Sequence, residues 1–110
     1  MAQISSFYQN TTKVFSGVIT HNGTNPDTTA DTITFIMKAS KLDSDSDAVV
    51  DVDATGLGLG GIFTISLTPS ITDDLPAMYY YELVWHTAGG EVYVLESDTV
   101  EVKDKVQDNV

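Results

Sequence analysis

Five closely spaced aspartates are the side chains of this chain that most resemble a chemical site. They lie within "DSDSDAVVDVD" and are Asp43, Asp45, Asp47, Asp51 and Asp53. The run begins like a helix–loop–helix calcium loop, which needs glycine at its sixth position and glutamate at its twelfth. Counted from Asp43, those positions hold Ala48 and Ala54. The run therefore predicts a solvated acidic loop, with an irregular calcium site as the alternative.

The remaining reactive side chains form no recognised motif. The histidines are His21, in a predicted turn, and His86, at a predicted strand end, and we expect both to be exposed. Two ligands on separate loops are too few for zinc, and no G-x-S-x-G segment marks a nucleophile. The glycine run at 56–61 lacks the lysine and threonine of a phosphate-binding loop, so it predicts a hairpin connection. Because the chain also has no cysteine, we expect no enzymatic activity, no cofactor and no metal site.

The segment "DDLPAMYYYELVW" holds four of the six tyrosine and tryptophan residues in the chain. In a strand, alternation directs its odd-numbered side chains to one face. If exposed, Tyr79, Tyr81 and Trp85 would offer a platform on which carbohydrate can stack, and if buried they would form a sandwich core. We predict the core, because a small domain has few other side chains large enough to fill its interior. The predicted core residues are Phe35, Ile65, Tyr79, Tyr81, Leu83 and Trp85.

Apolar residues recur at a spacing of two along most of the chain, which indicates strands. The predicted strands are 12–20, 31–39, 48–52, 62–67, the aromatic strand at 79–86 and a final strand pair at 91–102. Between them, "TPSITDDLPA" is expected to form no more than one helical turn. Several short strands without a long helix predict a single all-β domain, an antiparallel sandwich.

In the final strand pair, the apolar residues change from odd-numbered to even-numbered positions. Tyr93 and Leu95 are odd-numbered, whereas Val100 and Val102 are even-numbered. If both pairs face the core, the chain must absorb one extra residue as a bulge or a bend. We expect this irregularity near Ser97-Asp98.

The chain is strongly acidic. It has 110 residues, with five basic against sixteen acidic side chains and a formal net charge of -11. This charge repels phosphate groups, so we do not expect direct binding to nucleic acid or to an anionic membrane. No apolar run approaches the ~20 residues of a membrane span, and "MAQISSFYQN" does not resemble a secretory signal.

Three segments resemble a known family. "VFSGVITHNGTNPDTTADTITFIMKA" is similar to two strands joined by an Asn-Gly and Pro-Asp turn, "GGIFTISLTPSITDDLPAMYYYELVW" to a strand, a short helical turn and an "lPaGxYxYel" strand, and "GEVYVLESDTVEV" to a closing strand. Together they resemble the immunoglobulin-like domains of tailed-phage structural proteins, such as the N-terminal domains of baseplate upper proteins. The resemblance covers residues 12–102 and departs from the family at Ala77 and Ser97, where glycine is usual.

The resemblance implies an immunoglobulin-like antiparallel β-sandwich of about seven strands at 11–104, followed by a C-terminal tail at 105–110. It also implies a non-enzymatic virion protein, made in the bacterial host cytoplasm. Its partners would be other copies of itself and other proteins of the capsid, tail or baseplate. Residues 1–10 predict either an assembly arm with Ile4, Phe7 and Tyr8 as contacts, or the first strand of the sandwich. The alternative function is a carbohydrate- or cell-surface-binding module, assisted by calcium.

Overall fold

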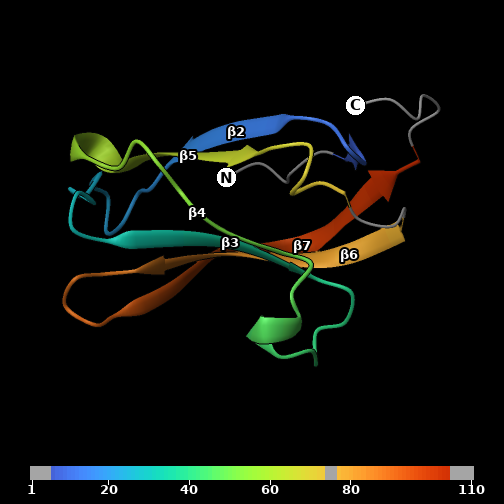
Figure 1. Cartoon of the computed structure of the whole chain (residues 1–110). Coiled ribbons are helices and arrows are strands. Elements are labelled where there is room, and N and C mark those ends of the chain that lie inside the picture. Colours follow the sequence, from blue (N-terminus) through green and yellow to red (C-terminus); the bar gives the residue numbers. More distant parts are fainter. Residues whose placement is uncertain (1–5, 74–76, 105–110) are drawn as a thin grey trace.

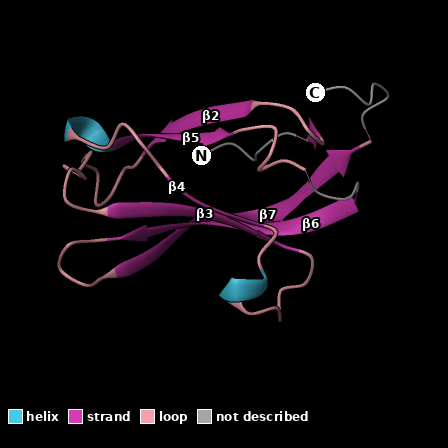
Figure 2. Ribbon diagram, in the orientation of Figure 1, coloured by secondary structure: helices cyan, strands magenta, loops and turns pink. Residues whose placement is uncertain are grey.

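The computed structural model describes residues 6–73 and 77–104, which are mostly strand (Figures 1 and 2). The strands in this part of the chain are β1 (Phe7–Tyr8), β2 (Lys13–Val18), β3 (Thr32–Lys38), β4 (Val50–Asp53), β5 (Ile62–Leu67), β6 (Ala77–His86) and β7 (Val92–Lys103). Two short 3-10 turns, η1 (Asp45–Asp47) and η2 (Leu59–Gly61), interrupt the loops. No described helix has the length and hydropathy that a membrane-spanning segment requires.

The strands form two sheets that pack face to face. One sheet has five strands in the order β1-β7-β6-β3-β4, and the other pairs β2 with β5. Figure 1 shows them as two layers, with β2 and β5 above β3, β6 and β7. In immunoglobulin domains the second and fifth strands share one sheet, while the third, sixth and seventh share the other with the sixth between them. This chain has that arrangement of strands, and the predicted all-β sandwich is confirmed.

The sandwich is antiparallel except at one pair. β1 runs parallel to β7, with Phe7 opposite Val102 and Tyr8 opposite Lys103. The predicted antiparallel sandwich therefore contains one parallel pair, at this edge. The reason is connectivity: the first and last strands lie side by side without a hairpin between them, so no turn forces them to run in opposite directions.

The core lies between the sheets and is built by strand alternation. The odd-numbered side chains of β6 point inward, and the six predicted core residues are each at most 6% exposed. Full burial of an apolar side chain of this size stabilises the fold by about 1.5–3 kcal/mol. Phe35 contacts the rings of Phe15 and Tyr81, with centroid separations of 5.5 and 5.8 Å. The Tyr81 hydroxyl donates a hydrogen bond to Glu96 Oε2 at 2.9 Å, so this buried phenol keeps a polar partner.

A β-bulge in β7 absorbs the parity change. Leu83 lies opposite Glu96, whereas the next residue, Val84, lies opposite Val94. Leu95 is therefore the extra residue, and both Tyr93 and Val100 can face inward. The bulge was expected near Ser97-Asp98, slightly further along the strand. Sequence parity shows that one residue must be absorbed, but the pairing with β6 decides where.

The glycine run joins β4 to β5, which belong to different sheets, so the predicted hairpin connection is found only in part. Thr55 and Thr64, on either side of the run, form an isolated antiparallel bridge. Gly61 has φ of +71°, and a Cβ there would lie 2.7 Å from the main-chain oxygen of Ile19. Its carbonyl oxygen also accepts a hydrogen bond from the Ile19 N–H at 2.9 Å. Glycine is required here because the chain approaches another backbone closely as it crosses between the layers.

A buried threonine ties two connections together at one end of the sandwich. Thr72, on the segment after β5, is fully buried. Its hydroxyl accepts a hydrogen bond from Thr11 N–H at 2.9 Å and donates one to the Thr11 carbonyl oxygen at 2.6 Å. Thr11 precedes β2, so this contact joins residues far apart in the sequence. The segment itself turns once, with the Thr72 N–H bonded to the Thr68 carbonyl oxygen at 3.0 Å.

Candidate functional site

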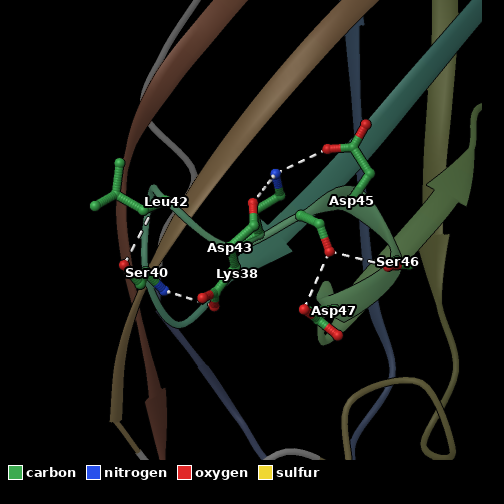
Figure 3. Close-up of polar contacts among 8 residues, drawn as sticks. Lys38, Ser40, Leu42, Asp43, Asp45, Ser46 and Asp47 are labelled. Carbon is green, nitrogen blue, oxygen red and sulfur yellow. Dashed lines mark hydrogen bonds and ion pairs between the residues drawn. The ribbon is translucent and has the colours of Figure 1, made fainter.

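The acidic loop, residues 39–49 between β3 and β4, is organised by local hydrogen bonds (Figure 3). Lys38 Nζ donates to the Asp43 carbonyl oxygen at 2.9 Å and to Asp45 Oδ1 at 2.8 Å. Asp43 Oδ2 accepts a hydrogen bond from the Ser40 N–H, and Asp47 Oδ2 accepts one from the Ser44 hydroxyl. The three carboxylates therefore bond to three different partners. An ion pair of this kind, with Asp45 largely exposed, contributes less than about 1 kcal/mol.

The carboxylates of the acidic loop do not converge on a common point. Among the described residues, no three histidine or acidic side chains are placed to hold one metal ion. Asp51 and Asp53 lie on β4 and are exposed, and Asp53 Oδ1 accepts a hydrogen bond from the Thr34 hydroxyl at 3.0 Å. The geometry gives no support to the irregular calcium site considered as an alternative.

His21 was expected to be exposed, but it packs against an aromatic pair. Its ring centroid lies 5.6 Å from that of Trp85 and 5.0 Å from that of Tyr93. Trp85 Nε1 donates a hydrogen bond to Asp31 Oδ2 at 2.8 Å, and the other oxygen of this carboxylate accepts one from the Ala88 N–H. This cluster closes one end of the core. Sequence reasoning missed it, because the turn that returns His21 to the sheet brings together residues from three separate segments.

Hydrogen bonds shift the pKa of two groups near this end of the sandwich. Tyr93 donates a hydrogen bond to Glu91 Oε2 at 2.9 Å, and this carboxylate disfavours the phenolate, so the pKa of Tyr93 is raised. The side chain and N–H of Thr29 donate to Asp27 Oδ1, which favours the carboxylate and lowers the pKa of Asp27. Asp27 lies in the loop before β3, and Tyr93 lies near the start of β7. Neither shift creates an acid or a base poised near neutral pH.

The two histidines are not brought together for catalysis. His86 is exposed at the end of β6, where alternation directs it to the outer face of the five-stranded sheet. His21 contacts Trp85, whose side chain points inward. The carbohydrate platform also fails geometrically, because Tyr79, Tyr81 and Trp85 are buried. Their neighbour Tyr80 does face outward, but Lys41 Nζ lies over its ring, 5.1 Å from the centroid.

Of the two alternatives predicted for residues 1–10, the described part forms the first strand of the sandwich. Phe7 is 5% exposed and belongs to the core, because its strand pairs with β7. It is therefore not an exposed contact. Tyr8 is 50% exposed, with Lys103 Nζ 5.6 Å from its ring centroid, and it remains available at the surface. Ile4 lies outside the described residues.

The outer face of the β2–β5 sheet is uncharged and partly apolar. Alternation directs the even-numbered residues of both strands outward, and we call this set the neutral face: Val14, Ser16, Val18, Ile62, Thr64 and Ser66. Its three apolar residues, Val14, Val18 and Ile62, are each more than half exposed. Val18 lies directly opposite Ile62. These side chains form a small apolar surface without a partner in the described chain.

The contrast with the other layer makes the neutral face unusual for this chain. None of the sixteen acidic residues lies on β2 or β5, and Lys13 is the one charged residue of the two strands. The outer face of the five-stranded sheet also exposes apolar residues, among them Val92 and Val94. There, however, Glu82 of β6 and Asp51 of β4 both lie opposite Ile36 of β3, on either side of it. The signal that could have revealed the neutral face in the sequence is this gap in the acidic residues.

Comparison with known proteins gives no assignment: no protein-family model matches the chain, and no curated protein matches it.

Proposed function

We propose that this chain is a non-enzymatic structural protein of a tailed-phage virion, acting through protein–protein contacts on the capsid, tail or baseplate. The observation that carries the proposal is the neutral face. A chain with a net charge of -11 repels other acidic surfaces over a Debye length of about 8 Å at physiological salt. A surface that combines exposed apolar residues with an absence of carboxylates is where such a chain can be contacted most favourably.

The energetics suit a contact that is repeated many times. Val14, Val18 and Ile62 are each about half exposed. Covering each of them would add roughly half of the 1.5–3 kcal/mol that full burial of such a side chain contributes. One contact of this size is weak, because association also costs translational and rotational freedom. When many such contacts form on one symmetric particle, their combined strength is far greater than that of a single contact.

The virion setting is supported by the resemblance of three segments to tailed-phage structural domains, together with a fold of the kind that this resemblance implies. The absence of an enzymatic role is supported by the separation of the histidines and by the divergent carboxylates of the acidic loop. A carbohydrate-binding function has no comparable support, because its proposed aromatic platform is buried.

The test is incorporation into particles, measured by quantitative mass spectrometry of purified virions of a phage that encodes this chain. Val18→Lys places a charge on the neutral face, and Val94→Lys is the matched control. Both valines are similarly exposed, at 55% and 56%, but they lie on opposite layers. We expect wild type and Val94→Lys at full occupancy and Val18→Lys strongly depleted. A wild-type chain absent from purified particles would refute the virion role, and equal occupancy of both variants would refute the neutral face as the contact.

A further inference from the structure

The strand β2 has a free edge with a defined set of backbone groups. Among the described residues β2 pairs with β5 alone. The Ile19 N–H bonds to Gly61 on the β5 side, and Thr64 of β5 exchanges two hydrogen bonds with Thr55, away from β2. Because successive residues in an antiparallel ladder direct their backbone groups to opposite sides, the odd-numbered residues of β2 bond to β5. The N–H and C=O groups of the even-numbered residues, 14, 16 and 18, therefore project from the free edge.

This edge lacks the features that keep other edges from pairing. Proteins protect exposed edges with charged residues, proline or bulges. β4, at the edge of the other sheet, carries Asp51 and Asp53, and the part of β7 beyond β1 carries a bulge and Asp98. Residues 14–18 of β2 contain no charge and no proline, and their register with β5 is continuous. The other edge of this sheet, on β5, is also uncharged, but there Thr64 is already bonded to Thr55. The edge of β2 is thus the one of the two that no described segment occupies, and another strand can be added there without repulsion.

The sequence of β2 is complementary to itself. In "VFSGV", Val14 and Val18 are placed symmetrically about Ser16, and Phe15 is balanced by Gly17. An antiparallel copy related by a two-fold axis at Ser16 would place Val14 opposite Val18 of the second copy and Ser16 opposite its own equivalent. Phe15 would lie opposite Gly17 of the second copy, where no side chain competes for space. A two-fold interface requires this kind of self-complementarity.

The residue types at positions 15 and 17 both favour the close approach of a second strand at this edge. Glycine in the interior of a strand weakens it and often marks a bulge or the close approach of another backbone. Gly17 pairs in register with Phe63, so no bulge explains it. Phe15 is a large inward-facing side chain that remains partly exposed, although its ring contacts Phe35. A second copy would extend the inner layer beside Phe15 and cover it.

The axis at Ser16 is selected by register. A shift of one residue would place outward side chains opposite inward ones. An axis at Phe15 or at Gly17 would leave a projecting group of Val18 or of Val14 without a partner on the opposite β2. With the axis at Ser16, Val14 lies opposite Val18 of the second copy, and Ser16 lies opposite Ser16 of the second copy. Each of these facing pairs exchanges two hydrogen bonds.

We infer that two copies of this chain associate along β2, antiparallel about a two-fold axis at Ser16, and join their two-stranded sheets into one four-stranded sheet. The inference rests on the proposed function, in that it names a second copy as one partner of the layer that carries the neutral face. It also agrees with the charge distribution, since β2 and β5 bring no carboxylate to the interface. The neutral faces of the two copies become continuous across the axis.

The first experiment measures the molar mass in solution by sedimentation equilibrium, for wild type, Ser16→Lys and Ser66→Lys. Ser66 is the matched control, because it is also an exposed serine of the neutral face but lies on β5, away from the free edge. We expect wild type and Ser66→Lys at twice the 11.9 kDa of the chain. We expect Ser16→Lys at 11.9 kDa, because two like charges would face each other at the axis. Mixing Ser16→Lys with Ser16→Glu should restore the doubled mass.

The second experiment uses the absence of cysteine from the chain. Hydrogen-bonded antiparallel pairs have Cα atoms about 5.5 Å apart, which falls within the ~4.4–6.8 Å range of disulfides. Ser16→Cys should therefore form a disulfide-linked dimer under mild oxidation in dilute solution, whereas Ser66→Cys should remain uncrosslinked. Circular dichroism of each variant verifies that the sandwich is folded.

The outcomes separate this inference from the proposed function. A monomeric wild-type chain, or equal cross-linking of both cysteine variants, would overturn the pairing while leaving the virion role intact. Ser16→Cys that instead cross-links to a different protein in particles would assign the edge to that protein. A wild-type monomer that dimerises only after removal of residues 1–5 would assign the edge to that segment, and would also overturn self-pairing. Absence from particles would refute the virion role without affecting a dimer measured in solution.

Discussion

Replacing Thr72 by valine tests how the two connections at one end of the sandwich are joined. Valine keeps the branched shape of threonine but lacks the hydroxyl, so the N–H and the carbonyl of Thr11 both lose a partner. Each hydrogen bond contributes about 0.5–1.5 kcal/mol net, and a buried polar group left unsatisfied costs about 1–3 kcal/mol. Thr11 is only partly buried, so water can replace part of this loss. We expect the free energy of unfolding to fall by about 2–3 kcal/mol.

The measurement is urea unfolding followed by the fluorescence of Trp85, the single tryptophan. A domain of this size has a total stability of about 5–15 kcal/mol, so the expected loss is a large shift of the midpoint at unchanged slope. Thr64→Val is the control, because Thr64 faces outward on β5 and keeps its backbone pairing. It should stay within about 0.5 kcal/mol of wild type. A Thr72→Val protein as stable as this control would refute the reasoning.

Four further changes test other parts of the structure. Gly61→Ala should destabilise the domain by about 1–3 kcal/mol, since its Cβ would collide with a main-chain oxygen, whereas Gly58→Ala, which meets open space, should have a much smaller effect in the same urea assay. Trp85→Ala should lower stability by about 3–5 kcal/mol, and a melting temperature within a few degrees of wild type would contradict the core described above. In an alkaline absorbance titration Tyr93 should ionise above the ordinary tyrosine range, and Glu91→Gln should lower its pKa towards that range; an unchanged titration would exclude the hydrogen bond as the cause. Millimolar calcium should leave the melting temperature unchanged, because a tight site in the acidic loop would add about 4 kcal/mol at a thousandfold excess over Kd.

The sequence predicted the inward and outward faces of the strands well, because alternation is a local property. Phe35, Ile65 and the odd-numbered residues of β6 were predicted to form the core, and the structure buries them. The parity argument also found that one residue had to be absorbed in β7. It could not find its position at Leu95, since that depends on how β6 and β7 align over their whole length.

The errors concern properties that depend on distant parts of the chain. The glycine run at 56–61 has the composition of a hairpin connection. Whether the strands on either side of it, β4 and β5, share a sheet depends on how all the strands are arranged. For residues 1–10 the sequence left an arm and a first strand as alternatives, and only the parallel pairing of Phe7 with β7 decides between them. The environment of His21 likewise depends on Tyr93, which is far away in the sequence. The neutral face was visible in the sequence as a gap in the acidic residues, but only the pairing of β2 with β5 places both gaps on one surface.

The parallel pairing of β1 with β7 has a mechanical consequence. Because β1 and β7 run in the same direction side by side, the start of β1 and the end of β7 lie at opposite ends of the pair. Tension applied at these two points pulls the strands in opposite directions along their common axis. The hydrogen bonds that join the two strands, together with the bond from the Gln9 N–H to the Lys103 carbonyl oxygen, are then loaded in shear and must break together. An antiparallel pair at the same place would open like a zipper, one bond at a time. The fold therefore places its most direct resistance to stretching at the seam between its two ends.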